Sequence, residues 1–342
     1  MKKASSKIIF FLIAVMTGLI VAEYFKWIDL PWYLFKDFVI NFIGGPLKKL
    51  LTGTIMSPAF AIVLIVTLVM ERLYPAEKNK KMFSLSFAQD LVWFLYESIL
   101  HALIIATVVE LIKTVYAQHF AFMTIEAANV WPEWARFALG VLLLDFLYWW
   151  QHYINHKVPF FWKLHSVHHS QKQLNFFTDF RYHVLEYVVR ESVLAVPFLV
   201  LHVDVPKIVA FSVFRRWYTR FYHGNIRMNM GPLRHVLVTP QSHRIHHSFQ
   251  REHHDMNFGS LFCIWDHLFK TQYKNYDEYP ATGITDEHFP HEKELSLGHL
   301  LTMPVVQMLY PFRDIFRSLR KKLASLKLTP ARTNHGSKPK EA

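Results

Sequence analysis

The sequence predicts an all-α protein, a multi-pass membrane helical bundle that carries a histidine-rich helical cap. Of its 342 residues, 52% are hydrophobic and 16% are aromatic, which is high for a soluble domain. The apolar residues fall in runs close to the length of a bilayer-spanning helix. Eight of the 21 histidines lie in compact clusters, three or four residues apart, and this spacing places side chains on one helical face.

The charge and the cysteine usage narrow the class further. The net charge of +12 suits either a nucleic acid or an anionic membrane surface. The apolar runs favour the membrane, so no nucleic-acid partner is expected. The single cysteine, Cys263, excludes an internal disulfide and a multi-cysteine metal site. A metal site in this chain would therefore need histidine and carboxylate ligands.

Residues 1–130 are predicted to form the N-terminal transmembrane helices. The apolar run 8–25 follows a basic start, and we interpret it as an uncleaved helix, with a signal peptide as the alternative. Two more runs follow at 55–70 and 87–115. The last of these contains Asp90 and Glu110, which we place at the two membrane interfaces, and His101, which we interpret as a buried structural histidine.

Residues 131–280 are predicted to form the histidine-bearing domain, together with the last membrane helices. A fourth apolar run, 134–150, leads directly into the first histidine cluster. The runs 187–203 and 205–222 are short or carry charges, so a shallow helical hairpin and two full crossings stay open as alternatives.

Residues 281–342 are predicted to form a basic tail. Within it, 313–327 has the pattern of an amphipathic surface helix, and 328–342 has the composition of a disordered segment. Lysine and arginine residues before the first run and after the second place these ends on the cytoplasmic side. The fourth run then ends on that side too, so the histidine clusters are expected to face the cytoplasm.

Three histidine clusters are the strongest signal in the chain. Eight imidazoles exceed the four ligands of a tetrahedral zinc site, so the pattern favours two metal ions. Imidazole ligates iron, zinc, copper or nickel, and its second nitrogen usually donates to a carboxylate or a carbonyl. The clusters are His152 and His156; His165, His168 and His169; and His243, His246 and His247. The expected supporting side chains are Asp145, Asn175, Asp179, Glu186, Asp255, Asn257 and Asp266.

The alternative interpretation is that these histidines are unrelated interfacial residues. A single two-histidine match arises easily by chance. Three clusters, two of them with the pattern H-x-x-H-H, make a chance origin a poor explanation.

The clusters and their surroundings resemble the fatty acid hydroxylase / sterol desaturase superfamily, which consists of integral-membrane di-metal oxygenases. The resemblance covers roughly residues 135–275 and includes the segments FWKLHSVHHS, TPQSHRIHH and NFGSLFCIWDHLFKT. It adds His223, in FYHGN, as a ligand. It also adds His183, in RYHVLE, where Val184 replaces the proline of the family pattern. In the last segment, His267 and Lys270 stand where the family has arginine and glycine.

The resemblance implies an enzyme that activates O2 at two iron ions, with zinc as a substitute acquired on purification. It implies attack on an unactivated C–H bond of a lipid, such as a fatty acyl or sterol-like substrate. Hydroxylation is the expected outcome, and desaturation at the same site is the alternative. No haem, flavin or nucleotide motif is present, so electrons are expected from a ferredoxin, cytochrome b5 or reductase. The expected location is a bacterial inner membrane or the endoplasmic reticulum, with the active site facing the cytoplasm.

Two functions from other classes compete with this interpretation. A metal transporter would need ligands near the bilayer midplane, whereas the clusters lie beyond the ends of the apolar runs. A zinc hydrolase would carry an H-E-x-x-H or an open three-ligand pattern, which the sequence lacks.

Overall fold

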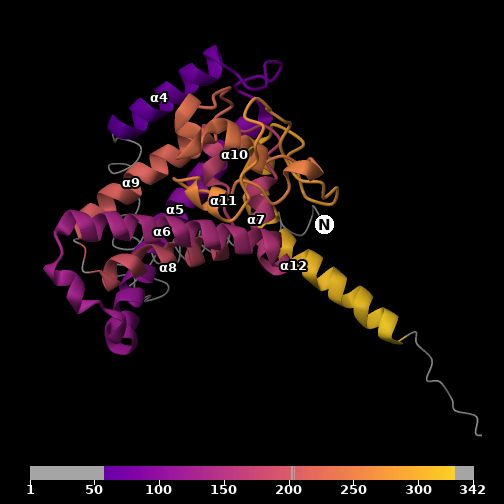
Figure 1. The fold of residues 1–342 in the computed structure, drawn as a ribbon. Coiled ribbons are helices and arrows are strands. Elements are labelled where there is room, and N and C mark those ends of the chain that lie inside the picture. The colour runs from indigo at the N-terminus through magenta and orange to yellow at the C-terminus, as the bar shows by residue number, and fades with distance from the viewer. Residues whose placement is uncertain (1–57, 202, 204, 328–342) are drawn as a thin grey trace, which may run out of the picture. The chain divides into compact units, whose positions relative to one another are not determined.

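The computed structural model describes residues 58–201, 203 and 205–327 (Figure 1). In this part of the chain, the regular elements are helices, and β pairing is limited to isolated bridges such as Pro75 with Ile226. The all-α class is therefore confirmed for the described residues. The predicted first membrane helix, 8–25, and the predicted disordered segment, 328–342, lie outside them.

The α-helices follow the apolar runs and the histidine clusters. Helix α6 joins the fourth apolar run to the first cluster without a break, as expected. Helix α7 starts at a proline, which is pre-set for the first helical turn. The helices are α4 (Pro58–Leu73), α5 (Leu85–Val115), α6 (Glu133–Lys157), α7 (Pro159–His169), α8 (Val184–Val200), α9 (Val205–Tyr222), α10 (Pro240–His246), α11 (Ile264–Leu268) and α12 (Leu297–Lys327).

Helices α6 and α8 pack closely around an apolar core. Leu144 and Tyr148 of α6 are buried with Phe198 of α8 and with Leu201 just after it. The approach is close at Gly140, where an added Cβ would lie 2.9 Å from the Phe198 ring. Any side chain there would push the two helices apart, and α6 carries two of the predicted ligands.

A second core is built from aromatic rings on four elements. Phe60 of α4 stacks on Phe94 of α5, with ring centroids 5.8 Å apart. Phe94 in turn meets Phe180, at the end of the short helix η6 (Phe176–Phe180), at 4.7 Å. Trp217 of α9 packs against Phe60 at 5.5 Å. These edge and stacked contacts tie α4, α5 and α9 to the segment that follows α7.

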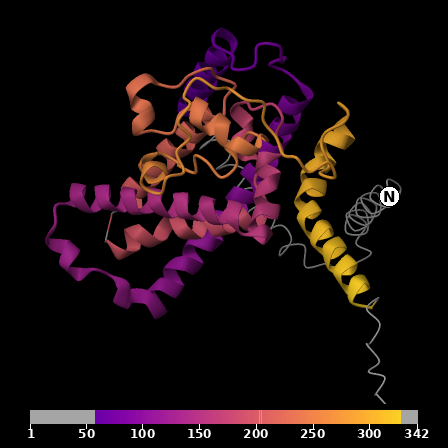
Figure 2. The same cartoon turned by 45° about the vertical axis from the view of Figure 1, so that its right-hand side comes forward.

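Helix α12 lies against α5 and α7 (Figure 2). Gln89 and Tyr96 of α5 donate hydrogen bonds to the carbonyls of Leu300 and Leu301. Trp93 of α5 donates its indole N–H to the side chain of Gln307 at 3.0 Å. The C-terminal helix is therefore part of the fold around the histidines and extends beyond the predicted surface helix 313–327.

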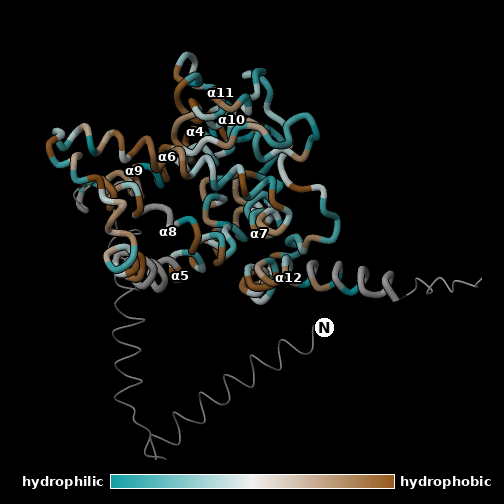
Figure 3. Tube along the Cα trace, turned by 60° about the horizontal axis from the view of Figure 1, so that its bottom comes forward, coloured by the Kyte–Doolittle hydropathy of each residue, from teal (hydrophilic) through white to brown (hydrophobic). Residues whose placement is uncertain are grey.

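Hydropathy is unevenly spread along the trace: the helices carry long apolar stretches, and polar residues gather in the loops near α10 and α11 (Figure 3). Among the residues that the structure describes, no helix combines enough length with enough apolar character to cross a membrane. The membrane-spanning part of the fold prediction stays a prediction.

Candidate metal centre

Nine histidines converge into two groups. Within each group, one ligand nitrogen from every ring lies within 4.8 Å of those of the others. The five-histidine group is His152, His156, His165, His169 and His246. The four-histidine group is His168, His223, His243 and His247. The structure thus brings together all eight clustered histidines, together with His223.

The two H-x-x-H-H clusters divide their side chains between the groups in opposite ways. In α7, His165 and His169 lie one turn apart and join the five-histidine group, while His168 points to the other group. In α10 and its C-cap, His243 and His247 belong to the four-histidine group, and His246 belongs to the five-histidine group. Each of these two helices therefore serves both groups and links them.

The Nε2 atoms face one another inside each group. In the five-histidine group, Nε2 of His169 lies 3.1 Å from that of His165 and 3.2 Å from that of His156. In the four-histidine group, His243 and His223 approach to 2.8 Å. Rings held this close without a cation between them gain little, so the arrangement fits nitrogens gathered for a shared ligand.

In the five-histidine group, the Nδ1 atoms are fixed from outside. Nδ1 of His152 donates to the carbonyl of Phe258 at 3.0 Å, and Nδ1 of His246 donates to that of Met256 at 2.8 Å. A carbonyl only accepts, so these nitrogens carry the proton and Nε2 keeps its lone pair. Nδ1 of His165 lies 2.7 Å from a carboxylate oxygen of Glu186.

The four-histidine group is held by main-chain carbonyls. Nδ1 of His168 donates to the carbonyl of Arg181 at 3.2 Å, and Nδ1 of His223 donates to that of Thr219 at 2.6 Å. These contacts again leave Nε2 as the unprotonated nitrogen. Tyr182 stacks on His168 with ring centroids 4.7 Å apart and fixes the plane of that ring.

Burial keeps these imidazoles neutral. Desolvation, reinforced by the neighbouring histidines, holds the pKa of His168, His169 and His243 well below its usual value. Burial lowers the pKa of His246 to about 3. Neutral imidazole is the form that binds a metal, so the sites need not lose protons on loading.

The residues present fit metal ions with a preference for nitrogen. The Nε2 atoms of His152 and His246 are buried and have no hydrogen-bond partner within the described chain, although both are aimed into the five-histidine group. Buried polar atoms without a partner are unusual and call for a ligand. Iron, zinc, copper and nickel accept imidazole, whereas magnesium and calcium prefer oxygen.

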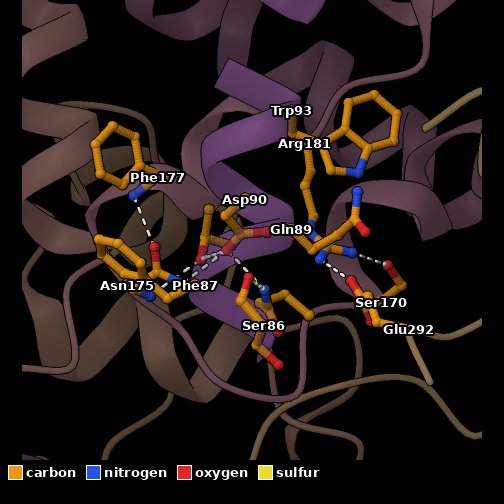
Figure 4. Close-up of polar contacts among 12 residues, drawn as sticks. Ser86, Phe87, Gln89, Asp90, Trp93, Ser170, Asn175, Phe177, Arg181 and Glu292 are labelled. Atoms are coloured by element: carbon orange, nitrogen blue, oxygen red, sulfur yellow. Dashed lines mark hydrogen bonds and ion pairs between the residues drawn. The ribbon is translucent and has the colours of Figure 1, made fainter. Parts of the chain in front are cut away.

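A buried network of polar contacts joins Arg181 to Ser170 and Glu292 (Figure 4). The guanidinium of Arg181 is fully buried and pairs with Asp90 of α5 and with Glu292. It also donates to the hydroxyl of Ser170, next to the second cluster, at 3.3 Å. Because the Arg181 carbonyl accepts from His168, the network fixes the main chain that orients this ligand. Sequence reasoning placed Asp90 at a membrane interface and missed this role.

Three of the predicted supporting side chains lie beside a ligand. Glu186 contacts His165, as described above, and also accepts from Asn155 at 3.0 Å. Asp179 lies 3.6 Å from Nδ1 of His223. Asp255 lies 3.9 Å from Nδ1 of His156 and is partly exposed.

The other four supporting residues bond to the chain rather than to a histidine. Asp145 was expected to face His152, but its oxygens accept from the main chain of Leu261 and Phe262 and from Trp265. The main-chain N–H groups of Leu261 and Phe262 require acceptors, which Asp145 provides. Asn175 caps η6 and donates to Asp90.

Asp266 and Asn257 hold the loop that reaches His152. Asp266 accepts from the main-chain N–H of Phe258 at 2.8 Å, and the carbonyl of Phe258 holds His152. Asn257 donates to the carbonyl of Ser242 at 2.9 Å. The turn after Asp266 survives without the family's glycine, because Lys270 adopts the left-handed backbone with φ 61°.

The structure does not place His183 in either group. Its Nδ1 accepts from the N–H of Leu185 at 3.1 Å and caps α8, while its Nε2 donates to the carbonyl of Met308 at 2.9 Å. Both ring nitrogens are used, so neither is left for a metal. A histidine at a helix start looks like a ligand in the sequence, and only the fold reveals its capping role.

Two cavities reach the histidines from different sides. The first lies among α5, α6, α8 and α9, and its lining includes His152, His168 and His223 together with several arginines and carboxylates. The second lies against His156 and His246, beside the loop after α10. Both groups are therefore open to small molecules, and the first cavity is the more strongly charged.

The segment that contains the converging histidines matches a known family. Residues 137–271 match the family model described as fatty acid hydroxylase. This segment resembles a fatty acid hydroxylase domain. It covers α6 to α11, and all nine converging histidines lie inside it. The resemblance inferred from the histidine spacing is confirmed.

Curated relatives of the fatty acid hydroxylase domain act on lipids, according to their names. The chain is 34% identical over 177 residues to alkylglycerol monooxygenase of Caenorhabditis elegans, a match that covers 46% of this chain and 34% of that protein. It is 30% identical over 178 residues to the human alkylglycerol monooxygenase, covering 52% of this chain and 38% of the relative. It is 27% identical over 141 residues to ornithine lipid hydroxylase OlsE of Rhizobium tropici, a match that covers 41% of this chain and 43% of that protein. The chain thus spans well under half of these relatives' lengths, and no solved structure matches it.

Proposed function

We propose that the chain is a membrane-bound lipid hydroxylase that holds two iron ions in its two histidine groups. The observation that carries the proposal is the convergence of nine imidazoles, with Nε2 atoms turned inward and the Nδ1 atoms of five of the rings anchored outward. Nitrogen-only donor sets of this size suit a redox-active transition metal. The relatives named above are lipid oxygenases by name, which supports the same reaction class.

The reaction inserts one oxygen atom of O2 into a C–H bond of a lipid and reduces the other to water. It consumes two electrons and two protons. Bound iron would supply the activation of O2 and the abstraction of hydrogen. The electrons come from a separate ferredoxin, cytochrome b5 or reductase, since the sequence has no motif for a second redox cofactor.

The side chains of this chain do the positioning. Glu186 and the carbonyls of Phe258 and Met256 keep the imidazole protons on Nδ1, so that each Nε2 stays directed inward. The arrangement is fixed before any substrate arrives, as catalysis by preorganised groups requires. The cavity among α5, α6, α8 and α9 gives the lipid a path to these nitrogens.

The membrane location belongs to the same proposal. Exposed apolar side chains line α4, among them Ile62, Ile65 and Leu73. Such a surface suits contact with lipid, which is where the substrate resides. We place the histidine groups on the cytoplasmic side, because the basic residues of the sequence favour that topology.

Comparative lipid mass spectrometry of cells with and without the gene tests the reaction. A product heavier by one oxygen atom supports hydroxylation, whereas a product lighter by two hydrogens assigns the chain to desaturation, the alternative at the same site. Metal analysis of detergent-purified protein tests the centre. Two irons per chain with O2 consumption are expected, and stoichiometric zinc with esterase or protease activity would replace the proposal by a zinc hydrolase.

A further inference from the structure

Arg215 of α9 is a buried cation in the first cavity and forms no ion pair with a carboxylate of the described residues. Arg215 is only 5% exposed to solvent. It donates to the hydroxyl of Ser260 at 3.2 Å and lies over the ring of Tyr148, 4.0 Å from the centroid. Its Nε has no hydrogen-bond partner, and no carboxylate of the described chain lies at ion-pair distance from it.

Other buried arginines of this protein are treated differently. Arg181 pairs with two carboxylates, and Arg244 pairs with Glu77. Within the same cavity, Nε of Arg220 lies 3.9 Å from Asp179. An unpaired buried cation destabilises a fold by several kcal/mol as a rule, so Arg215 stands out as a group kept for a function.

The acids near Arg215 are already engaged. Asp145 is within electrostatic reach, but its oxygens accept three N–H groups of the loop 261–265. Glu186, across the cavity, is held through one carboxylate oxygen by His165 and Asn155. Glu97 also lines the cavity, and its charged neighbours are Arg190, Arg216 and Arg220 rather than Arg215. The described carboxylates therefore leave Arg215 able to take an anion from a bound molecule.

The position of Arg215 relates it to the metal centre. It lies on α9, eight residues before His223, which directly follows that helix; eight helical residues span about 12 Å along the axis. The Tyr148 ring beneath it comes from α6, one turn before His152. The same cavity is lined by Arg215, His152 and His223, so one bound molecule can touch the guanidinium and reach the histidine nitrogens.

We propose that Arg215 binds an anionic oxygen group of the substrate, a phosphate or a carboxylate. This inference rests on the proposed function and narrows its substrate class to anionic lipids. A planar guanidinium matches either group with two parallel hydrogen bonds. The anion fixes the polar end of the lipid, and the C–H bond that reacts lies close to that end.

Binding of short amphiphiles to the full-length purified protein tests the proposal. Isothermal titration with octyl phosphate, octanoate and octanol compares a phosphate, a carboxylate and a neutral head on one tail. At least one anion is expected to bind about tenfold or more tighter than octanol, because hydrogen bonds to a charged group are the strong ones. Preference for octyl phosphate or for octanoate identifies the head group.

Variants of Arg215 test whether this side chain causes the preference for anionic amphiphiles over octanol. Arg215→Met is expected to bind the anions no tighter than octanol, and Arg215→Gln carries the same expectation if the methionine variant does not fold. Arg251→Met, at an exposed arginine, is the matched control and keeps the full preference. Equal binding of all three amphiphiles to the unaltered protein would overturn the proposal, as would an Arg215→Met protein that still prefers the anion.

The iron content of the same samples separates this inference from the proposed function. Anion preference without bound metal supports the anion site and overturns the oxygenase. Two irons with O2 consumption but no anion preference support the oxygenase and overturn the role of Arg215.

Discussion

The five-histidine and the four-histidine groups contain the same kind of ligand but are supported differently. In the five-histidine group, His152 and His156 are half-buried, and a side-chain carboxylate, Glu186, holds a third ring. In the four-histidine group, every ring is buried, and the carbonyls of Arg181 and Thr219 hold two of the rings. The carboxylate beside this group, Asp179, lies 3.6 Å from Nδ1 of His223, whereas Glu186 lies 2.7 Å from Nδ1 of His165. Side-chain support can be changed by one substitution, whereas carbonyl support changes only when the backbone moves.

The difference means that distant residues matter more for the four-histidine group. The carbonyl that orients His168 is placed by the Arg181 network, which reaches α5 and the segment before α12. The carboxylate that orients His165 acts directly. Paired variants, one from each group, test whether the two groups differ in this way.

The largest effect is expected from removing one ligand of each group. His246→Ala and His168→Ala should both abolish product, because the ligands of a metal centre act as a unit. Each variant should keep only part of the bound metal, since each removes a ligand from one group alone. Metal analysis and product mass spectrometry measure both. His299→Ala, at a half-buried histidine outside both groups, should change neither. Full metal and turnover in His168→Ala would contradict the assignment.

Acid should destabilise the metal-free protein by several kcal/mol. The pKa of His246 falls from its usual 6.5 to about 3 on folding, mainly through burial. The unfolded chain therefore binds more protons between these values, so stability is full above pH 6.5 and is lost as pH falls toward 3. The thermal midpoint of chelator-treated protein measures this. A midpoint that stays constant from neutral to mildly acid buffer would show that the rings are not buried as described.

Arg181→Met should weaken the four-histidine group and the fold together. It leaves Asp90 and Glu292 buried without their cation, which costs about 3–5 kcal/mol. Thermal unfolding measures the loss of stability, and metal analysis should show the loss of metal. Arg251→Met is the exposed control. If Arg181→Met lowered the midpoint but kept all metal, the side-chain network would not be what positions the carbonyl behind His168.

Glu186→Gln should act on the five-histidine group with little effect on folding. Loss of the carboxylate behind His165 is expected to weaken metal binding about 10–100-fold. Asp255→Asn is the matched control, because its oxygen lies 3.9 Å from His156 and it is partly exposed. Competition with a chelator measures both affinities. Equal losses in the two variants would mean that the contact to Glu186 has no special role.

The smallest effect on metal binding is expected at His183. Asparagine also caps helices, so His183→Asn should keep all metal. It should lower stability by about 1–3 kcal/mol, because the partly buried carbonyl of Met308 loses its donor. His223→Asn, at a ligand of the four-histidine group, should lose metal. Metal loss of the same size in the two variants would return His183 to the ligand set.

The helices and the histidine clusters could be predicted because both depend on local spacing. Residues 165 and 169 must share a face of any helix that contains them, and α7 is such a helix. His223 has no cluster of its own, and only the family resemblance singled it out. The convergence of the clusters could be predicted because there are three of them; a single cluster would not have indicated a shared site.

The supports could not be predicted, because they join residues far apart in the chain. Asp90 and Arg181 are 91 positions apart, and nothing local pairs them. Carbonyl supports leave no trace in the sequence, since every residue has a carbonyl. Asp145 has the right spacing to face His152, yet the N–H groups of a distant loop take its oxygens.

The reach of the Arg181 network has a consequence for biosynthesis. Glu292 and Gln307 belong to it, and they leave the ribosome long after the last histidine of the centre has done so. Until they arrive, the guanidinium lacks half of its partners, and the carbonyl behind His168 has no fixed direction. A metal ion should therefore be held tightly in the four-histidine group only after the nascent polypeptide has passed Gln307.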